Sequence, residues 1–186
     1  VDMEFLGITG VEDKLQEGVP SAIYKLRTAG IKVWMLTGDK YSTAIQIGKS
    51  CHLLSHEGSL HTIHNAPESE MVDEMVEIDK IVDPKTGTHS IIVEGPTLAK
   101  ILAKTDMKEL FRDMAMRCHT VICCRVTPQQ KADVVELVKN TGKVTLAIGD
   151  GGNDVSMIQS ANVGVGIQGR EGLQASRASD FSIGSM

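Results

Sequence analysis

Short apolar runs alternate with amphipathic segments along most of the chain. The apolar runs have the length of buried strands, and the amphipathic segments place their apolar residues at helical spacing. This alternation predicts an α/β fold, a doubly wound and mostly parallel sheet with helices on both faces. The predicted strands cover residues 5–11, 31–36, 90–93, 120–124, 144–148, 163–165 and 180–183.

Turn and capping residues mark several of the predicted helices. Gly18 and Pro20 open a helix that Gly30 closes. Residues 127–130 (TPQQ) form a capping box with proline at the first helical position, so Lys131 falls in the first turn of the next helix. The predicted helices cover residues 20–29, a segment around 44–51, 97–117 with a break near 105, 128–140, and a short segment ending near 161.

The stretch from about 55 to 89 breaks this rhythm. It is polar, rich in His, Glu and Asp, and without a sustained period, which predicts an insertion on the surface. Its histidines, with His52, suggest either a metal site or a solvated loop. We treat residues 1–186 as one domain, because the length suits a single core and no linker divides it.

Composition excludes several classes of function. A formal charge of −5 and an aromatic content of 3% argue against a nucleic-acid partner. No run approaches the roughly 20 apolar residues needed to span a bilayer, so the chain is expected to be soluble. The chain has no initiator Met and no signal-peptide pattern, which indicates a fragment of something larger. The cysteines, without a CxxC pair, are predicted to be reduced, buried thiols: Cys51, Cys118, Cys123 and Cys124.

Candidate chemistry falls at three predicted strand ends. Residues 37–39 (Thr-Gly-Asp) follow one strand, Arg125 and Lys131 follow a second, and residues 149–154 (Gly-Asp-Gly-Gly-Asn-Asp) follow a third. Ligands of doubly wound sheets bind beyond the carboxyl ends of the strands. We therefore expect these three features to converge on one site.

The 149–154 loop is the most specific of the three. Its glycines allow a tight turn and a close approach to a ligand. Asp150 and Asp154 place two carboxylates near each other, which favours a bound cation, and Mg²⁺ suits such oxygen ligands. Asn153 can donate to a phosphate oxygen. The structural alternative is an Asx-type turn and helix N-cap supplied by Asn153 or Asp154 alone.

The other two features also have structural alternatives. Thr37 can offer its hydroxyl and backbone N–H to a phosphoryl group, but the same loop could be a plain turn in which Asp39 or Ser42 caps a helix. Lys131 lies where the helix dipole disfavours a cation, which favours a role in neutralising a phosphoryl group. Alternatively, Lys131 and Arg125 are solvated surface residues.

These motifs resemble the later motifs of P-type ATPases, which lie within the haloacid dehalogenase superfamily. The resemblance rests on residues 37–39, Lys131 and residues 149–155. Further segments are similar to the phospholipid-flippase branch: residues 10–16 (GVEDKLQ), 123–128 (CCRVTP), 154–161 (DVSMIQSA) and 168–172 (QGREG). The similarity covers most of the chain apart from residues 55–89 and identifies it as the C-terminal part of a phosphorylation domain.

The resemblance implies a role for each matching residue. Asp150 binds Mg²⁺ with Asp154 beside it, and Lys131 contacts the phosphate. Thr37, Gly38 and Asn153 help to hold the phosphate, while Asp39 and Arg125 contact the nucleotide. The catalytic set in this chain would be Lys131, Thr37 and Asp150.

It also implies the setting of the parent protein. The parent forms an aspartyl phosphate from ATP and uses its breakdown to move phospholipid between leaflets. This chain would be a cytosolic-facing domain of that integral membrane protein, which could take an accessory membrane subunit.

The sequence departs from the family pattern at two points. Gly152 stands where the family usually has Ala. The nucleophile of the family lies in an Asp-Lys-Thr-Gly-Thr motif that this sequence lacks, so the chain alone is expected to be inactive. Residues 83–88 (DPKTGT) look similar, but Pro84 separates Asp from Lys and no buried strand precedes them. Two alternatives stay open, a stand-alone haloacid dehalogenase-like phosphatase and a non-catalytic Mg²⁺- or phosphate-binding module.

A dinucleotide-type pattern, GxGxxG at residues 164–169, is also present. A dinucleotide site would lie early in a βαβ unit, with an acidic residue about 20 positions further on, and the chain ends too soon for that. We therefore expect its glycines to shape a loop.

Overall fold

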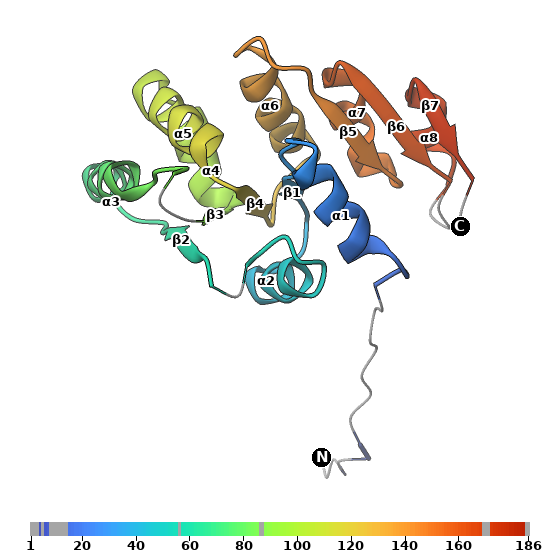
Figure 1. The fold of residues 1–186 in the computed structure, drawn as a ribbon, viewed down its shortest axis with the longest axis horizontal. Helices are drawn as coiled ribbons and strands as arrows, with labels where there is room; N and C mark the ends of the chain where they lie inside the picture. The colour runs from blue at the N-terminus through green and yellow to red at the C-terminus, as the bar shows by residue number, and fades with distance from the viewer. Residues whose placement is uncertain are drawn as a thin grey trace.

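The strands form two parallel sheets (Figure 1), described here from a computed structural model for residues 4, 6–7, 15–55, 57–85, 88–168 and 172–184. The first sheet has four strands in the order β1-β4-β3-β2, and the second has three in the order β5-β6-β7. All pairings between neighbouring strands are parallel. The bounds are β1 Met35–Leu36, β2 Ser59–Ile63, β3 His89–Glu94, β4 Thr120–Cys124, β5 Leu146–Gly149, β6 Val163–Ile167 and β7 Phe181–Ile183.

Helices flank both sheets and confirm the predicted α/β class, although the strands are divided between two sheets. α1 ends near Gly30 as predicted, and the break near residue 105 separates α4 from α5. None of the described helices is long and apolar enough to cross a membrane. The bounds are α1 Val19–Thr28, α2 Tyr41–Ser50, α3 Glu68–Ile81, α4 Gly95–Leu102, α5 Thr105–Arg117, α6 Pro128–Lys139, α7 Val155–Ser160 and α8 Gln174–Ala178, with a 3₁₀ turn η1 at Gly152–Asp154.

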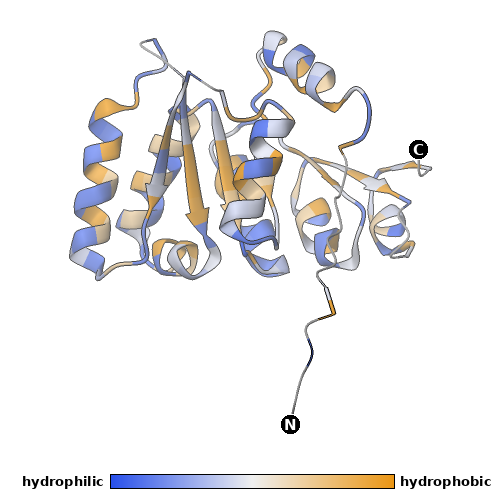
Figure 2. Ribbon diagram, turned by 90° about the horizontal axis from the view of Figure 1, so that it is seen from below, coloured by the Kyte–Doolittle hydropathy of each residue, from blue (hydrophilic) through white to orange (hydrophobic). Residues whose placement is uncertain are grey.

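The core lies on both faces of β3 and β4. Alternate residues of a strand point to opposite faces, so Ile91 and Val121 join a large cluster with Phe111 of α5. Their neighbours Ile92 and Ile122 join a second cluster under α2. Figure 2 shows these strands as hydrophobic ribbons between helices that carry both colours. The four cysteines are free and buried, as predicted, and burial raises the pKa of Cys118 and Cys124 to about 11.

The predicted strand at 31–36 is much shorter in the structure. Only Met35 and Leu36 are strand, and they pair with β4 on one side alone. Ile31, which we assigned to this strand, is 51% exposed. Most of the predicted strand at 5–11 lies outside the described residues.

We predicted no strand or helix within the polar stretch at 55–89, but most of that stretch forms regular elements. It contains β2, which pairs with β3, and α3, which buries Met71, Met75 and Ile78. These three residues have helical spacing, so a narrow apolar stripe exists among many acidic positions. Whether the stretch is an insertion relative to other proteins stays a prediction.

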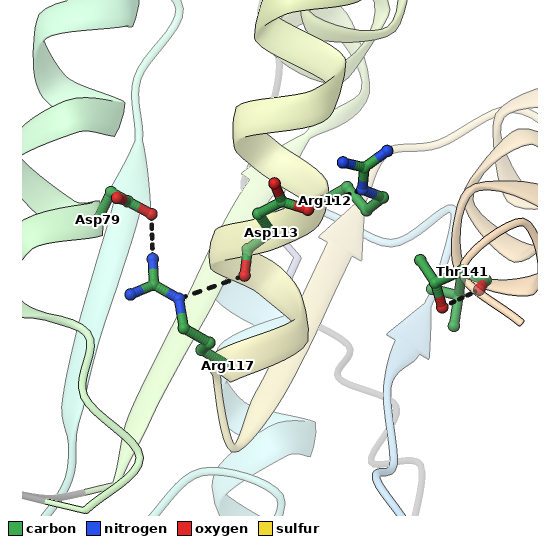
Figure 3. Close-up of polar contacts among 6 residues, drawn as sticks. Asp79, Arg112, Asp113, Arg117 and Thr141 are labelled. Atoms are coloured by element: carbon green, nitrogen blue, oxygen red, sulfur yellow. Dashed lines mark hydrogen bonds and ion pairs between the residues drawn. The ribbon is translucent and has the colours of Figure 1, made fainter. Parts of the chain in front are cut away.

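Arg117 connects α5 to α3 through an ion pair and a hydrogen bond. Figure 3 shows Arg117 extending from α5 toward Asp79 of α3, with which it forms an ion pair. Its Nη1 also donates to the carbonyl oxygen of Val82 at 3.1 Å, just after the end of α3. A cation at this position suits the carbonyl-rich C-terminus of a helix.

The glycines at 164 and 166 do not shape a loop, contrary to our expectation. Both lie inside β6, where helices pack closely against the backbone. A Cβ at Gly164 would lie 2.6 Å from Cγ2 of Ile158, and one at Gly166 would lie 2.4 Å from the carbonyl oxygen of Ala175. The sequence match to a dinucleotide loop therefore reflects the close packing of α7 and α8.

Candidate phosphate and metal site

The loop after β1 is bonded to the end of β4. Thr37 donates its backbone N–H to the carbonyl of Cys123 at 2.9 Å and accepts from the N–H of Val126 at 3.2 Å. The N–H of Arg125 donates to the carbonyl of Asp39 at 2.9 Å. The structure therefore brings together the first two of the three predicted features.

The side chains of Thr37 and Asp39 bond to each other. The Thr37 hydroxyl donates to Oδ2 of Asp39 at 2.8 Å and accepts from the Asp39 N–H at 3.1 Å. The N-cap of α2 is Lys40, which makes no side-chain capping bond. The structure therefore excludes the alternative in which the side chain of Asp39 or Ser42 caps α2. Instead, the loop holds a hydroxyl and a carboxylate together beyond the end of β1.

Arg125 has an uncommon backbone conformation. Its φ is 53°, a left-handed value that residues other than glycine seldom adopt. Its carbonyl oxygen lies 2.2 Å from the position that a Cβ on Gly95 would occupy, so Gly95 has to be glycine. The Arg125 guanidinium lies 3.6 Å from Oε1 of Glu94. We did not predict a role for Glu94, although its place at the carboxyl end of β3, beside β4, was the available signal.

Lys131 is buried instead of solvated. The predicted capping box is confirmed, with Thr127 accepting from the Gln130 N–H and the Gln130 side chain accepting from the Thr127 N–H. This cap starts α6 and places Lys131 in its first turn. Only 6% of Lys131 is exposed, and its Nζ lies 2.7 Å from Oδ1 of Asp154. The surface alternative for Lys131 is therefore excluded.

Asp154 closes the 149–154 loop on itself. Its Oδ2 accepts from the backbone N–H groups of Asp150 at 3.3 Å and Gly151 at 3.4 Å. A Cβ on Gly149 would lie 2.3 Å from the Cβ of Asp154, so glycine is required there. Asp154 makes no side-chain capping bond to α7. The carboxylate thus acts within the loop and on Lys131.

Asp150 and Asn153 are exposed at the surface of the same loop. In the described part of the chain, hydrogen bonds to Asp150 involve its backbone N–H, and none involves its carboxylate. That carboxylate is consequently available to a cation, whereas both oxygens of Asp154 have protein partners. The described residues contain no cluster of three or more His, Cys, Asp or Glu that could hold a metal. A single available carboxylate fits Mg²⁺, which commonly binds one or two carboxylates and completes its shell with water and phosphate.

The site residues form two groups. Thr37, Asp39 and Arg125 make one group, and Lys131, Asp150 and Asp154 make the other. In the contacts of the described residues, no hydrogen bond or ion pair joins these six residues across the two groups. Both groups follow carboxyl ends of parallel strands, and the capped start of α6 connects them along the chain. We therefore keep as a prediction that the two groups contact the same ligand once it is bound.

The fold and these loops define a class of protein. Parallel strands end in a Thr-Gly-Asp loop, a buried lysine and an aspartate-rich loop, which together describe a haloacid dehalogenase-like α/β domain.

Comparison with known proteins narrows this class. No protein-family model matches the chain. The probable phospholipid-transporting ATPase DNF3 of Saccharomyces cerevisiae is 47% identical over 98% of the chain, which spans 11% of that protein. Phospholipid-transporting ATPase 2 of Arabidopsis thaliana is 48% identical over 98% of the chain, which spans 17% of that protein. The probable phospholipid-transporting ATPase IM of Homo sapiens is 46% identical over 98% of the chain, which spans 18% of that protein. The chain is therefore homologous to a segment of the phospholipid-transporting P-type ATPases and spans less than a fifth of the length of these relatives.

Proposed function

We propose that this chain is the phosphate- and magnesium-handling part of a phosphorylation domain in an ATP-driven phospholipid transporter. The observation that carries the proposal is the buried Lys131–Asp154 pair next to the available carboxylate of Asp150. Burying a lysine is costly, and the cost is justified where a cation has to meet an anionic ligand. The relatives named above support phospholipid as the cargo of the parent.

Asp150 is our candidate metal ligand. When bound, Mg²⁺ would neutralise phosphate charge and orient the phosphoryl group. Asp154, which we also considered as a ligand, has its Oδ1 on Lys131 and its Oδ2 on loop N–H groups. We therefore assign Asp154 to the positioning of Lys131 and of the loop that carries Asp150.

The remaining residues divide between phosphate and nucleotide. Lys131 and the hydroxyl of Thr37 would contact the phosphoryl group, with Gly38 and Asn153 supporting it through a close backbone approach and an amide donor. Asp39 and Arg125 would contact the nucleotide, and the exposure of the Arg125 guanidinium supports this role. Thr37 would have to exchange its bond to Asp39 for one to the phosphoryl group.

The nucleophilic aspartate has to come from another part of the parent chain. Asp83, the candidate within this sequence, lies in a turn between α3 and β3, where the Lys85 N–H donates to its Oδ1 at 2.9 Å. This turn precedes β3, so it lies at the amino end of the strand and not at the carboxyl end that carries the site. β1 and β5 each have one unpaired edge among the described strands, and a strand carrying the nucleophile could pair there.

Magnesium titration of the chain tests the metal assignment. We expect Mg²⁺ to shift the backbone amide resonances of residues 149–154 in a ¹⁵N NMR titration, and Asp150→Asn to abolish the shifts. Asp106→Asn, at an exposed carboxylate of α5, is the control and should leave them unchanged. Equal shifts in Asp150→Asn would reject Asp150 as the ligand.

Enzyme assays separate the proposal from its alternatives. The chain should not hydrolyse a generic phosphomonoester such as p-nitrophenyl phosphate, whereas turnover would indicate a stand-alone phosphatase. In the parent protein, Lys131→Ala should reduce phosphoenzyme formation from ATP. Unchanged phosphoenzyme formation would favour a non-catalytic binding module. Co-purification of the parent would also identify any accessory membrane subunit.

A further inference from the structure

Among the described strands, β2 is the outermost strand of the first sheet and is paired on one side only. It pairs with β3, while the candidate site follows β1 and β4 at the other end of the sheet (Figure 1). The Ser59 N–H donates to the carbonyl of Thr88 at 2.9 Å, so residue 59 points its backbone groups toward the neighbouring strand. Backbone groups alternate along a strand, which directs those of Leu60 and Thr62 toward the open edge. An open edge of this kind is a template for another strand.

A groove of ≈ 480 Å³ runs along this open edge. One wall consists of Leu60, His61 and Thr62, three consecutive residues of β2. Consecutive strand residues point to opposite faces, so a groove that touches all three follows the edge of the strand instead of one face. The opposite wall belongs to α3 and consists of Glu74, Glu77, Ile78 and Ile81.

Glu74 marks where the open edge ends. Its Oε2 accepts from the His64 N–H at 2.8 Å, and its Oε1 lies 2.6 Å from Nδ1 of the same histidine. Residue 64 continues the alternation of Leu60 and Thr62, so its N–H is the next one to point outward. A carboxylate of α3 therefore already binds one outward N–H, while those of Leu60 and Thr62 have no partner in the described part of the chain.

The groove lies in the acidic part of the chain. Residues 55–81 contain seven of the 24 acidic residues and one of the 19 basic residues. Glu77 lines the groove and pairs with Lys80 at 2.6 Å, but 71% of the Glu77 side chain and 61% of the Lys80 side chain are exposed. Such an exposed pair is weak and exchanges readily. Ile81 adds an apolar surface that is 52% exposed.

We propose that this groove binds an extended, lysine- or arginine-rich segment of a partner protein, which adds to β2 as a further strand. The backbone of the segment would pair with Leu60 and Thr62. A basic side chain would lay its apolar stem on Ile81 and bring its charge to Glu77, because long basic side chains can cover apolar surface while the charge stays hydrated. A second copy of this chain is a poor occupant, because its own β2 edge carries the same negative charge.

Synthetic peptides test the proposal on the full chain. The probe is a short peptide that alternates lysine and threonine, added to ¹⁵N-labelled chain. We expect its binding to shift the amide resonances of Leu60 and Thr62. A peptide with glutamate in place of lysine should not bind, and a lysine peptide that is N-methylated at alternate backbone positions should lose most of its affinity. Equal binding of the N-methylated peptide, or shifts confined to α3, would overturn strand addition.

Substitutions in the groove test the charge requirement. Glu77→Lys should weaken binding of the lysine peptide by about threefold to tenfold. Glu109→Lys, at an exposed position of α5 that does not line the groove, is the matched control and should bind like the unmodified chain. If both variants weakened binding equally, the effect would come from the overall charge of the chain, and the site would be rejected. Concentration-dependent shifts of Leu60 and Thr62 without peptide would make the edge an interface between copies and overturn the proposal.

Discussion

The two sheets of this molecule differ in how completely they are covered. Every residue of β4 in the first sheet is buried, and its neighbour β3 is buried at four successive positions. β5 in the second sheet alternates instead, with Leu146 57% exposed and Ile148 54% exposed. Strands of parallel sheets are normally covered on both faces. The first sheet meets this condition within the described chain, and the second does not.

Register explains which face of the second sheet is open. Ile148 pairs with Val165, which pairs with Phe181, so these residues lie side by side on one face. Phe181 is 63% exposed. The opposite face contains Gly164 and Gly166, against which α7 and α8 pack. We infer from this difference that the first sheet contributes most of the stability. The second sheet combines a candidate site with an apolar face on which Ile148 and Phe181 are exposed, although Val165 between them is buried.

Two phenylalanines provide the sharpest test of this comparison. Phe111 is fully buried against the first sheet, and Phe111→Ala should lower the free energy of unfolding by about 3–5 kcal/mol. Phe181→Ala removes the same atoms from the open face and should cost less than about 1 kcal/mol. Urea unfolding followed by circular dichroism measures both. Comparable losses in the two variants would mean that the open face is covered in solution.

The buried ion pair of the site should produce the next largest effect. Asp154→Ala leaves Lys131 buried without its partner and should destabilise the chain by about 3 kcal/mol. It also removes the acceptor for the N–H groups of Asp150 and Gly151, so the loop should lose its amide protection in hydrogen exchange. Thermal unfolding and hydrogen exchange would measure the two effects.

A double variant separates the charge effect from a loss of packing. In Lys131→Met with Asp154→Ala, the uncompensated buried charge is absent. The double variant should therefore be less destabilised than the sum of the two single variants. Additive losses would show that the two side chains contribute independently, and the pair would then not be the element that joins α6 to the loop.

Sequence predicted strands and helix boundaries best where local signals and burial agree. The strand at 120–124 has the predicted bounds, and the capping box at Thr127 and Gln130 fixes the start of α6. β2 and α3 were not predicted, because their buried residues are surrounded by polar residues in the sequence. Met71 and Met75 have helical spacing, but two methionines among so many acidic residues gave too weak a signal.

At the site, the sequence predicted the loops but not their contacts. The end of β4 and the Thr-Gly-Asp loop were expected to meet, and their backbones do bond to each other. The pairing of Lys131 with Asp154 could not be predicted, because the motifs predicted a phosphate as the partner of Lys131 and a metal ion as the partner of Asp154. The left-handed conformation of Arg125 also had no sequence signal, since the glycine that makes room for it is Gly95, the first residue of α4.

The contact between α3 and α5 should have a smaller effect. Arg117→Ala removes the ion pair to Asp79 and the bond to the carbonyl of Val82, and should lower the free energy of unfolding by about 1 kcal/mol. Arg112 is the control on the same helix, because it bonds only to the adjacent Asp113 in the described contacts. Arg112→Ala should leave the unfolding midpoint unchanged. Equal behaviour of the two variants would mean that α3 does not depend on Arg117.

The smallest effect concerns two glycines of the 149–154 loop and tests how closely the second sheet is packed at the site. Gly152→Ala should be neutral or stabilise the chain by up to about 1 kcal/mol, because alanine restricts the unfolded chain. A Cβ there would lie 3.5 Å from the nearest atom, Oε1 of Gln174, which is ordinary contact. Gly149→Ala is the counterpart, since its Cβ would lie 2.3 Å from that of Asp154. It should destabilise the chain and abolish the Mg²⁺-dependent shifts, whereas Gly152→Ala should retain them. Loss of the shifts in Gly152→Ala would mean that the loop has to rearrange around the metal into a conformation that only glycine permits.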